Sequence, residues 1–222
     1  MKSLIPFLES HIEPWFKLQM FRALPRYNIV ELTVVRLKEE SYYRSFCKIA
    51  DKEQKLYFEG MAEGLYPLVA QLRALAEAYE RSCLKGYFGS SVTKMGEGRP
   101  YGAGVGFRRS SAIIRAYGEF HERKSLTKLA AIEENRIFKI ATPYGEIYVA
   151  GLRFEDGTLG TGYGLLAKEA KDSAYRSALR KKSYSVERWT FHSVDSDPEV
   201  VCITPKNGGW LECYFVGLIV TN

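Results

Sequence analysis

The chain has 222 residues and a formal charge of +6, which is enough length for a full hydrophobic core in one large domain. The four cysteines lack C-x-x-C spacing and the three histidines are not clustered, which argues against a zinc site and a disulfide framework. No apolar run approaches a membrane span, and residues 1–15 carry acids and a proline that make a poor signal peptide. We therefore expect reduced thiols and a cytoplasmic protein.

The first quarter of the chain predicts a helix followed by strands. Residues 3–22 predict a short amphipathic helix that is broken near Pro14. Four large side chains of this helix are expected to pack onto the body: Trp15, Phe16, Met20 and Phe21. Alternating, β-branched residues then predict three strands at 27–37, 42–50 and 55–60, of which the first two form a hairpin.

Three long helices follow, each directly behind a glycine-rich segment. We expect these helices at 67–84, 110–128 and 166–182. The remaining segments predict a loop at 86–98 and strands at 101–107, 135–141, 146–154, 199–203 and 211–220. The last strand is apolar enough to be central in its sheet. This order predicts an α+β fold, in which repeated strand–glycine–helix units pack on a large, partly antiparallel sheet.

A sequence repeat organises the middle of the chain. The stretch LVAQLRALAEAYERSC at 68–83 returns 42 residues later, at 110–125, as SSAIIRAYGEFHERKS. Both copies fit the pattern G-x5-A-x3-A-x2-E-x2-E-R, which begins at Gly64 and again at Gly106. A weaker third copy keeps the glycine and the alanines but replaces the acids and the arginine: Gly164, Ala170 and Ala174 remain, with Ser177, Arg180 and Lys181.

The spacing of the repeat places a carboxylate and an arginine on one helix face. Steps of four, three and four residues keep Ala70, Ala74, Glu77 and Arg81 in one stripe, with Glu80 beside it, and the second copy repeats this stripe. Two glutamates three residues apart repel each other unless a positive group lies between them. A divalent cation such as Mg²⁺ would satisfy them. A solvated helix face with an i,i+4 Glu–Arg pair is the simpler alternative.

The glycines before the second helix also have two explanations. Gly102, Gly104 and Gly106 could let backbone N–H groups approach a phosphate at the helix N-terminus. The run lacks the spacing of a dinucleotide fingerprint or of a lysine-containing phosphate loop. Close packing of the strand explains it as well.

These motifs resemble those of the YcaO superfamily, which couples ATP hydrolysis to the modification of peptide backbone amides. The first nucleotide motif of that family is roughly S-A-x-x-E-x-x-E-R, and RALAEAYER at 73–81 resembles it. The second, G-x-x-x-G-x5-A-x3-A-x2-E-x2-E-R, is similar to the segment 102–123, and the third resembles 158–179. The resemblance implies one YcaO-like domain, 1–222, with an N-terminal helix and hairpin at 1–56, a nucleotide-site core at 57–182 and C-terminal strands at 183–222.

The resemblance also implies ATP and Mg²⁺ as cofactors. In the family, glutamates of the first two motifs hold Mg²⁺ ions that bridge the phosphates of ATP. Carried over, the metal-facing residues would be Glu77, Glu80, Glu119 and Glu122, and the residues near the phosphates would be Arg81, Arg123, Arg73 and Arg115. The implied chemistry is phosphorylation of an amide oxygen after a nucleophile adds to the carbonyl. Loss of phosphate then gives an azoline, as in a cyclodehydratase of peptide maturation, or a thioamide.

The chain departs from the family pattern at several positions. Arg73 replaces the serine of the first motif, and Arg115 stands at the matching place in the second. Ser111 replaces a frequent acid, while Ser177 and Arg180 replace the acid and amide side chains of the third motif. These departures leave open a degenerate member that binds a nucleotide or a partner protein without turnover, with arginines in place of metal.

A nucleic-acid-binding module is the third possibility. The basic excess permits an anionic partner, and residues 162–182 resemble the end of a double-stranded-RNA-binding domain. The basic side chains of this segment are Lys168, Lys171, Arg180, Lys181 and Lys182. Because four inward carboxylates would repel phosphate without a metal, nucleic acid is not the expected partner. We expect a peptide or protein substrate and no membrane. The sequence leaves open whether a separate leader-binding or sulfur-donor protein takes part.

Two geometric expectations complete the analysis. The helices at 67–84 and 110–128 should face one another, with their glutamates within about 10 Å of each other. The third helix should bury Ala170 and Ala174, expose its basic end, and contribute no carboxylate from Glu169 or Asp172.

Overall fold

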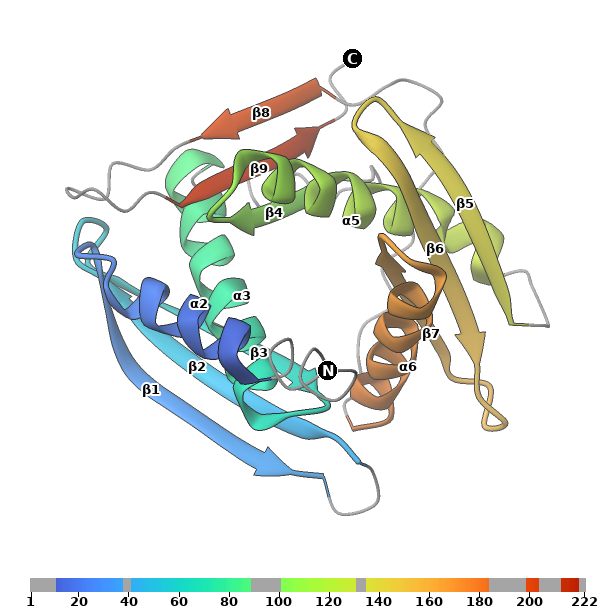
Figure 1. The fold of residues 1–222 in the computed structure, drawn as a ribbon, viewed down its shortest axis with the longest axis horizontal. Helices are drawn as coiled ribbons and strands as arrows, with labels where there is room; N and C mark the ends of the chain where they lie inside the picture. The colour runs from blue at the N-terminus through green and yellow to red at the C-terminus, as the bar shows by residue number, and fades with distance from the viewer. Residues whose placement is uncertain are drawn as a thin grey trace, which may run out of the picture. The chain divides into compact units, whose positions relative to one another are not determined.

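The computed structural model describes residues 11–37, 41–88, 101–130, 135–183, 199–203 and 213–219. Within these residues the fold is α+β, as expected. The described strands form three separate antiparallel sheets of three strands each, with the orders β1-β2-β3, β4-β9-β8 and β5-β6-β7 (Figure 1). They do not join into the one large sheet that the sequence predicted.

The chain divides into two compact units. The first comprises Met1–Gly89 with Thr204–Cys213, and the second comprises Ser90–Ile203 with Tyr214–Asn222. The three segments proposed for a single domain therefore stay a prediction. Among the described residues, the first unit has one sheet and the motif helix α3 (Pro67–Phe88), and the second has two sheets and two motif helices.

The first unit packs two helices on one sheet. Its elements are α2 (Glu13–Arg22), β1 (Tyr27–Arg36), β2 (Tyr43–Asp51), β3 (Leu56–Gly64) and α3 (Pro67–Phe88). The three predicted strands are confirmed, and β3 runs further than 55–60 because it pairs with β2 along its whole length, as far as Tyr43 opposite Gly64. The predicted loop at 86–98 begins inside α3, and its residues 89–98 lie outside the described part of the chain.

The N-terminal helix differs from its prediction in the side chains that it buries. Pro14 lies in the first turn of α2, where a missing N–H costs no hydrogen bond. Leu18 and Phe21 are buried, whereas Trp15 and Phe16 are 51% and 58% exposed. The expectation that these two aromatic side chains pack onto the body is therefore wrong. Residues 3–10 of the predicted helix lie outside the described residues.

Aromatic side chains fill the core of the first unit. Tyr79 of α3 is fully buried and meets the rings of Phe21 and Tyr27 edge-on, with centroids 5.7 Å and 4.9 Å away. Three described cysteines of this unit are buried free thiols: Cys47, Cys83 and Cys213. Burial raises the pKa of the Cys47 thiol to about 12.

The second unit contains two sheets, each with a helix packed on it. Its elements are β4 (Gly102–Gly106), α5 (Arg109–Ala130), β5 (Arg136–Thr142), β6 (Gly145–Arg153), β7 (Leu159–Gly164), α6 (Ala167–Ser183), β8 (Glu199–Ile203) and β9 (Tyr214–Ile219). As predicted, β9 is central in its sheet, between β4 and β8. Helix α5 covers β4 and β9, while α6 covers β6 and β7 (Figure 1).

Helix α5 also contacts the other sheet of this unit, through β6 and β7. The contact depends on a glycine. A Cβ atom added to Gly118 would lie 2.1 Å from the ring of Tyr163, a distance that no side chain accommodates. The absence of a side chain at this position therefore allows α5 and β7 to pack against each other. Both elements carry residues of the candidate site.

Glycine and alanine make the same contact in all three copies of the repeat. A Cβ added to Gly60, Gly102 or Gly160 would lie 2.0 Å from the carbonyl oxygen of an alanine on the following helix. Those alanines are Ala74, Ala116 and Ala174, and all three are fully buried. Each strand therefore packs directly against the backbone of its helix. This contact supports close packing, rather than approach to a phosphate, as the reason for the glycine run before α5.

Candidate functional site

The acid and the arginine of the first motif bind the outer edge of β3, which is the last strand of its sheet. Oε2 of Glu77 accepts a hydrogen bond from the backbone N–H of Met61 at 3.1 Å, and Oε1 pairs with Nη2 of Arg81 at 2.6 Å. Nη1 of Arg81 donates to the carbonyl of Glu59 at 2.9 Å. The carboxylate and the guanidinium are thus held both by each other and by the strand.

The second motif repeats this arrangement on β4, which is also an edge strand. Oε2 of Glu119 accepts from the N–H of Ala103 at 2.5 Å, and Oε1 pairs with Nη2 of Arg123 at 2.5 Å. Nη1 of Arg123 donates to the carbonyl of Tyr101 at 2.9 Å. Every partner lies 42 residues after its counterpart in the first motif. We call each of these sets of contacts a Glu–Arg–strand clamp.

The two arginines that depart from the family pattern bind the same edges further along. Nη1 of Arg115 donates to the carbonyl of Val105 at 2.9 Å, and Nη1 of Arg73 lies 3.4 Å from the carbonyl of Glu63. Their guanidinium groups therefore line the strand edge beside the clamps. Their assignment to the phosphates of a nucleotide stays a prediction.

The third copy keeps the cation of the clamp and loses the acid. Nζ of Lys181 donates to the carbonyl of Leu159 at 2.7 Å, in the position that Arg81 and Arg123 occupy in the other two copies. Ser177 stands where those copies have a glutamate. Helix α6 thus attaches its cation to this strand without a glutamate at the matching position.

The prediction for the third helix is confirmed in part. Ala170 and Ala174 are fully buried. The carboxylate of Glu169 accepts the backbone N–H groups of Leu165 and Leu166 at the start of its own helix, at 2.9 Å and 3.2 Å. The expected exposure of the basic end is wrong for the two residues described there, Arg180 and Lys181, which are half-buried. Of the other basic residues, Lys168 and Lys171 are exposed, and the side chain of Lys182 lies outside the described part.

The second glutamate of the second motif has a different environment from the first. Oγ1 of Thr161, on β7, donates to Oε1 of Glu122 at 2.7 Å. Burial of the carboxyl group raises the pKa of Glu122, and the hydrogen bond from Thr161 together with the cations of Arg123, Arg180 and Lys181 only partly opposes this rise. A carboxylate in such a position is costly to ionise. As whole residues, Glu122 and its counterpart on α3, Glu80, are both half-buried.

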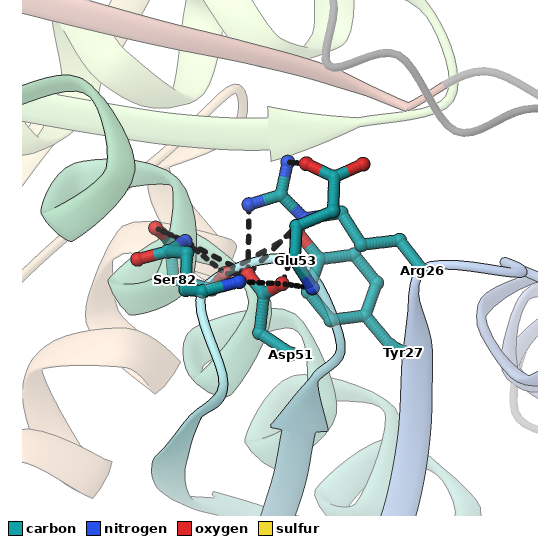
Figure 2. Close-up of polar contacts among 6 residues, drawn as sticks. Arg26, Tyr27, Asp51, Glu53 and Ser82 are labelled. Atoms are coloured by element: carbon teal, nitrogen blue, oxygen red, sulfur yellow. Dashed lines mark hydrogen bonds and ion pairs between the residues drawn. The ribbon is translucent and has the colours of Figure 1, made fainter.

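A polar cluster that the sequence reasoning missed fixes the C-terminal half of α3 (Figure 2). The buried carboxylate of Asp51 accepts from Nε and Nη2 of Arg26, from the hydroxyl of Ser82 at 2.5 Å and from the side chain of Gln54. These partners hold the pKa of Asp51 below its usual value despite the opposing effect of burial. Arg26 also pairs with Glu53, which keeps the cluster at the turn between β2 and β3.

This cluster positions the first clamp. Ser82 follows Arg81 directly in α3, so its hydrogen bond to Asp51 fixes the helix at the turn where the clamp ends. Both oxygens of the Asp51 carboxylate accept hydrogen bonds within the cluster, which indicates a structural tie rather than a binding site. The sequence signal was faint: an aspartate at the end of a strand, whose side chain accepts the N–H groups of Glu53 and Gln54 in the following turn.

The metal assignment of the four glutamates stays a prediction. Glu77 and Glu80 belong to the first unit, and Glu119 and Glu122 belong to the second. Among the described residues, no three or more His, Cys, Asp or Glu side chains are grouped so that they could hold a metal ion. One unit alone supplies only two motif carboxylates. The metal assignment therefore requires that α3 and α5 bring their glutamates together, and this requirement needs its own experiment.

No helix within the described part of the chain is both long and apolar enough to cross a membrane.

Comparison with known proteins found no matching family model and no matching curated protein. A solved structure, described as YcaO from Methanopyrus kandleri bound with AMPPCP and Mg²⁺, is similar with a TM-score of 0.45 and 13% sequence identity. The match covers 82% of this chain and 67% of that one. A likeness at this level carries no argument, so the contacts within this chain have to support its function.

Proposed function

We propose that the chain binds Mg·ATP through its two motif helices and uses it to modify a backbone amide of a peptide, in the manner of the YcaO proteins that its motifs resemble. The observation that carries the proposal is the repeated Glu–Arg–strand clamp. Glu77 with Arg81 and Glu119 with Arg123 make the same contacts with two different strands. Two carboxylates and two guanidinium groups are therefore held in defined orientations before any ligand binds.

Covering an edge strand does not by itself require the acids. In the third copy, Nζ of Lys181 donates to the strand carbonyl, and serine replaces the glutamate. The carboxyl group that meets this strand comes instead from Glu122 of α5, at Thr161. A helix can therefore attach its cation to the strand edge without a glutamate of its own. The buried carboxyl of Glu122 adds a second costly group on α5, and such groups concentrate at functional sites.

The donor groups fit Mg²⁺, which prefers carboxylate oxygens and commonly shares its site with phosphates. Each clamped carboxylate is already paired with an arginine, so a metal ion has to break that ion pair to bind. Arg81 is 53% exposed and Glu77 is 28% exposed. An ion pair with this exposure contributes only about 0–1 kcal/mol, which is a small cost against the binding of a divalent ion with a nucleotide. The pair of Glu119 and Arg123 is less exposed and harder to displace.

In the proposed site, the glutamates of the clamps would bind the metal and the arginines would bind the phosphates. The strand N–H groups of Met61 and Ala103 keep one oxygen of each glutamate fixed, which leaves the other oxygen for the metal. Arg81 and Arg123 stay anchored to strand carbonyls through Nη1 and retain other N–H donors for phosphate oxygens. Bound Mg²⁺ would supply neutralisation of the phosphate charge as the phosphoryl group transfers.

A second candidate is binding of the nucleotide without turnover. The observation that favours it is the ion pairing itself, because arginine neutralises the carboxylates of Glu77 and Glu119 in the described structure. The third copy, which has no acid at Ser177, points the same way. The two candidates make the same prediction for binding and different predictions for hydrolysis.

The test is a thermal melt with Mg²⁺ and ATP titrated together. Binding raises the melting temperature by mass action, with a stabilisation of about 2.7 kcal/mol at a hundredfold excess over Kd. Glu77→Gln and Glu119→Gln should reduce this shift. Because each glutamate also holds a strand, each variant should itself lose about 1 kcal/mol, so the shift is measured against its own ligand-free melting temperature.

Matched controls remove the same charge elsewhere. Glu13 and Glu146 belong to exposed ion pairs with Lys17 and Lys139, one in each unit. Glu13→Gln and Glu146→Gln should leave the Mg·ATP shift unchanged. A shift accompanied by ADP release with a candidate peptide supports the amide-modifying enzyme, and a shift without ADP release across a peptide panel supports the second candidate. Absence of any shift overturns both.

A further inference from the structure

The arginine of the second clamp is held by an aromatic ring as well as by its carboxylate. Cζ of Arg123 lies 3.7 Å from the centroid of the Tyr101 ring, and Nη1 of the same guanidinium donates to the carbonyl of Tyr101 at 2.9 Å. The side chain of Arg123 is only 21% exposed. One residue, Tyr101, therefore fixes both the face and one edge of the guanidinium.

This ring is particular to the second copy. The residue that corresponds to Tyr101 is Glu59 in the first copy and Leu159 in the third. Both supply the backbone carbonyl to their own cation, Arg81 or Lys181, but neither supplies an aromatic face. Since the backbone contact is common to all three copies, the ring is not needed to attach the cation to the strand.

The ring matters when the carboxylate is taken by a metal. An arginine that loses its ion pair to Mg²⁺ would regain the rotamer freedom of a long side chain, which is worth up to about 2 kcal/mol. Stacking on an aromatic face attracts the cation without using its N–H donors, because the interaction is with the ring quadrupole. The donors that pointed at Glu119 then remain available for an anion in the same place.

We infer that Tyr101 is a positioning residue, whose ring and carbonyl keep Arg123 directed at the phosphates of the nucleotide when Glu119 binds the metal. The inference rests on the proposed function, since it assigns a partner to Arg123 in the nucleotide-bound protein. It also sets the two clamps apart: Arg123 is held in advance, whereas the more exposed Arg81 is not held by a ring at the corresponding position.

The experiment compares the affinities of ATP, ADP and AMP, each with Mg²⁺, by isothermal titration calorimetry. Tyr101→Leu should weaken ATP binding roughly three- to tenfold, as expected for the loss of a partly desolvated cation–π contact. The loss should shrink from ATP to AMP, because the guanidinium acts on the phosphates. Tyr101→Phe keeps the aromatic face and should restore ATP binding to within about twofold of the wild type.

A matched control exists in the first unit. Nζ of Lys48 lies 5.2 Å from the centroid of the Tyr57 ring, so Tyr57→Leu removes a tyrosine–cation contact whose cation belongs to neither clamp. This variant should bind all three nucleotides as the wild type does. Tyr101→Met, whose unbranched side chain adapts better to an irregular gap, replaces Tyr101→Leu if the latter fails to fold.

The outcomes separate the inference from the proposed function. If the wild type binds no Mg·ATP, both are wrong. If the wild type binds and Glu119→Gln weakens binding, but Tyr101→Leu and Tyr101→Met do not, the function stands and the inference is wrong. A loss that is equal for ATP and AMP, or that Tyr101→Phe fails to restore, shows a packing role for the ring and also overturns the inference.

Discussion

Single residues of the same motif face opposite electrostatic conditions. Glu119 is stabilised as an anion by the N–H of Ala103 and the guanidinium of Arg123. Glu122, three residues later, has a buried carboxyl whose pKa is raised by burial, and Thr161 gives it a neutral donor. Glu122 therefore resists ionisation, and the pH dependence of stability tests this.

Replacement of Glu122 by glutamine should stabilise the ligand-free protein at neutral pH. A carboxyl whose folded-state pKa is raised contributes stability that is complete below its unfolded pKa of about 4.3 and is lost as the pH rises through the folded pKa. Glutamine carries no such dependence and can still accept from Thr161. The gain of Glu122→Gln over the wild type should therefore grow with pH, to about 1 kcal/mol.

Urea denaturation between acidic and slightly alkaline pH measures this difference. Glu146→Gln, which removes an exposed acid from the same unit, serves as the control and should show no such growth with pH. If Glu122→Gln is less stable than the wild type throughout, the carboxylate is satisfied in the folded state and our account of its environment is wrong. If Glu122 also serves the nucleotide, the stabilised variant should show a smaller Mg·ATP shift.

At the level of the element, the strand–helix unit depends on a missing side chain. The Cβ of an alanine at position 102 would lie 2.0 Å from the carbonyl oxygen of Ala116 and 2.7 Å from the backbone nitrogen of Phe120. Since both contacts are with backbone, neither can move out of the way alone. Gly102→Ala should therefore destabilise the protein by about 3 kcal/mol, at the upper end of overpacking effects.

The last glycine of the same strand provides the comparison. A Cβ at Gly106 would meet its nearest atom at 3.3 Å, so Gly106→Ala should cost much less than Gly102→Ala. Equilibrium urea unfolding with an unchanged m-value measures both. Equal effects would show that the strand shifts readily and that the glycine pattern has another cause.

Local patterns predicted the elements better than their partners. The repeat identified α3, α5 and α6 and the glycines behind them, because that signal depends on spacing within about 20 residues. It did not show that the strands divide into three sheets. The pairing of β9 with β4 joins residues such as Leu218 and Gly102, and hydrophobic alternation does not specify a partner so distant in the chain.

The candidate site follows the same rule. Spacing alone brought Glu77 and Arg81, and likewise Glu119 and Arg123, onto one face, and the structure pairs them. Their bonds to the strand edges were not predicted, because the edge is defined only once the sheet has formed. The ring of Tyr101 and the cluster around Asp51 were missed for the same reason.

At the level of the whole molecule, the remaining question is whether the two clamps serve one nucleotide. The sequence predicts convergence of α3 and α5, and this stays a prediction because the helices belong to different units. A double-mutant cycle addresses it without coordinates. The Kd of Mg·ATP is measured for the wild type, Glu77→Gln, Glu119→Gln and the double variant, together with the number of nucleotides bound per chain.

If both glutamates hold metal ions on the same nucleotide, their effects should be non-additive, with a coupling free energy above about 0.5 kcal/mol and one nucleotide per chain. The physical reason is that the first substitution already weakens the binding of the metal ions and nucleotide that both glutamates share. The second substitution therefore removes less binding free energy than it does alone. Independent sites would add within about 0.3–0.5 kcal/mol. The pair Glu77→Gln with Glu146→Gln sets the additive baseline, because Glu146 lies in an exposed ion pair with Lys139. Additive effects in the test pair with two nucleotides bound would mean that each clamp works alone, and the shared site would be wrong.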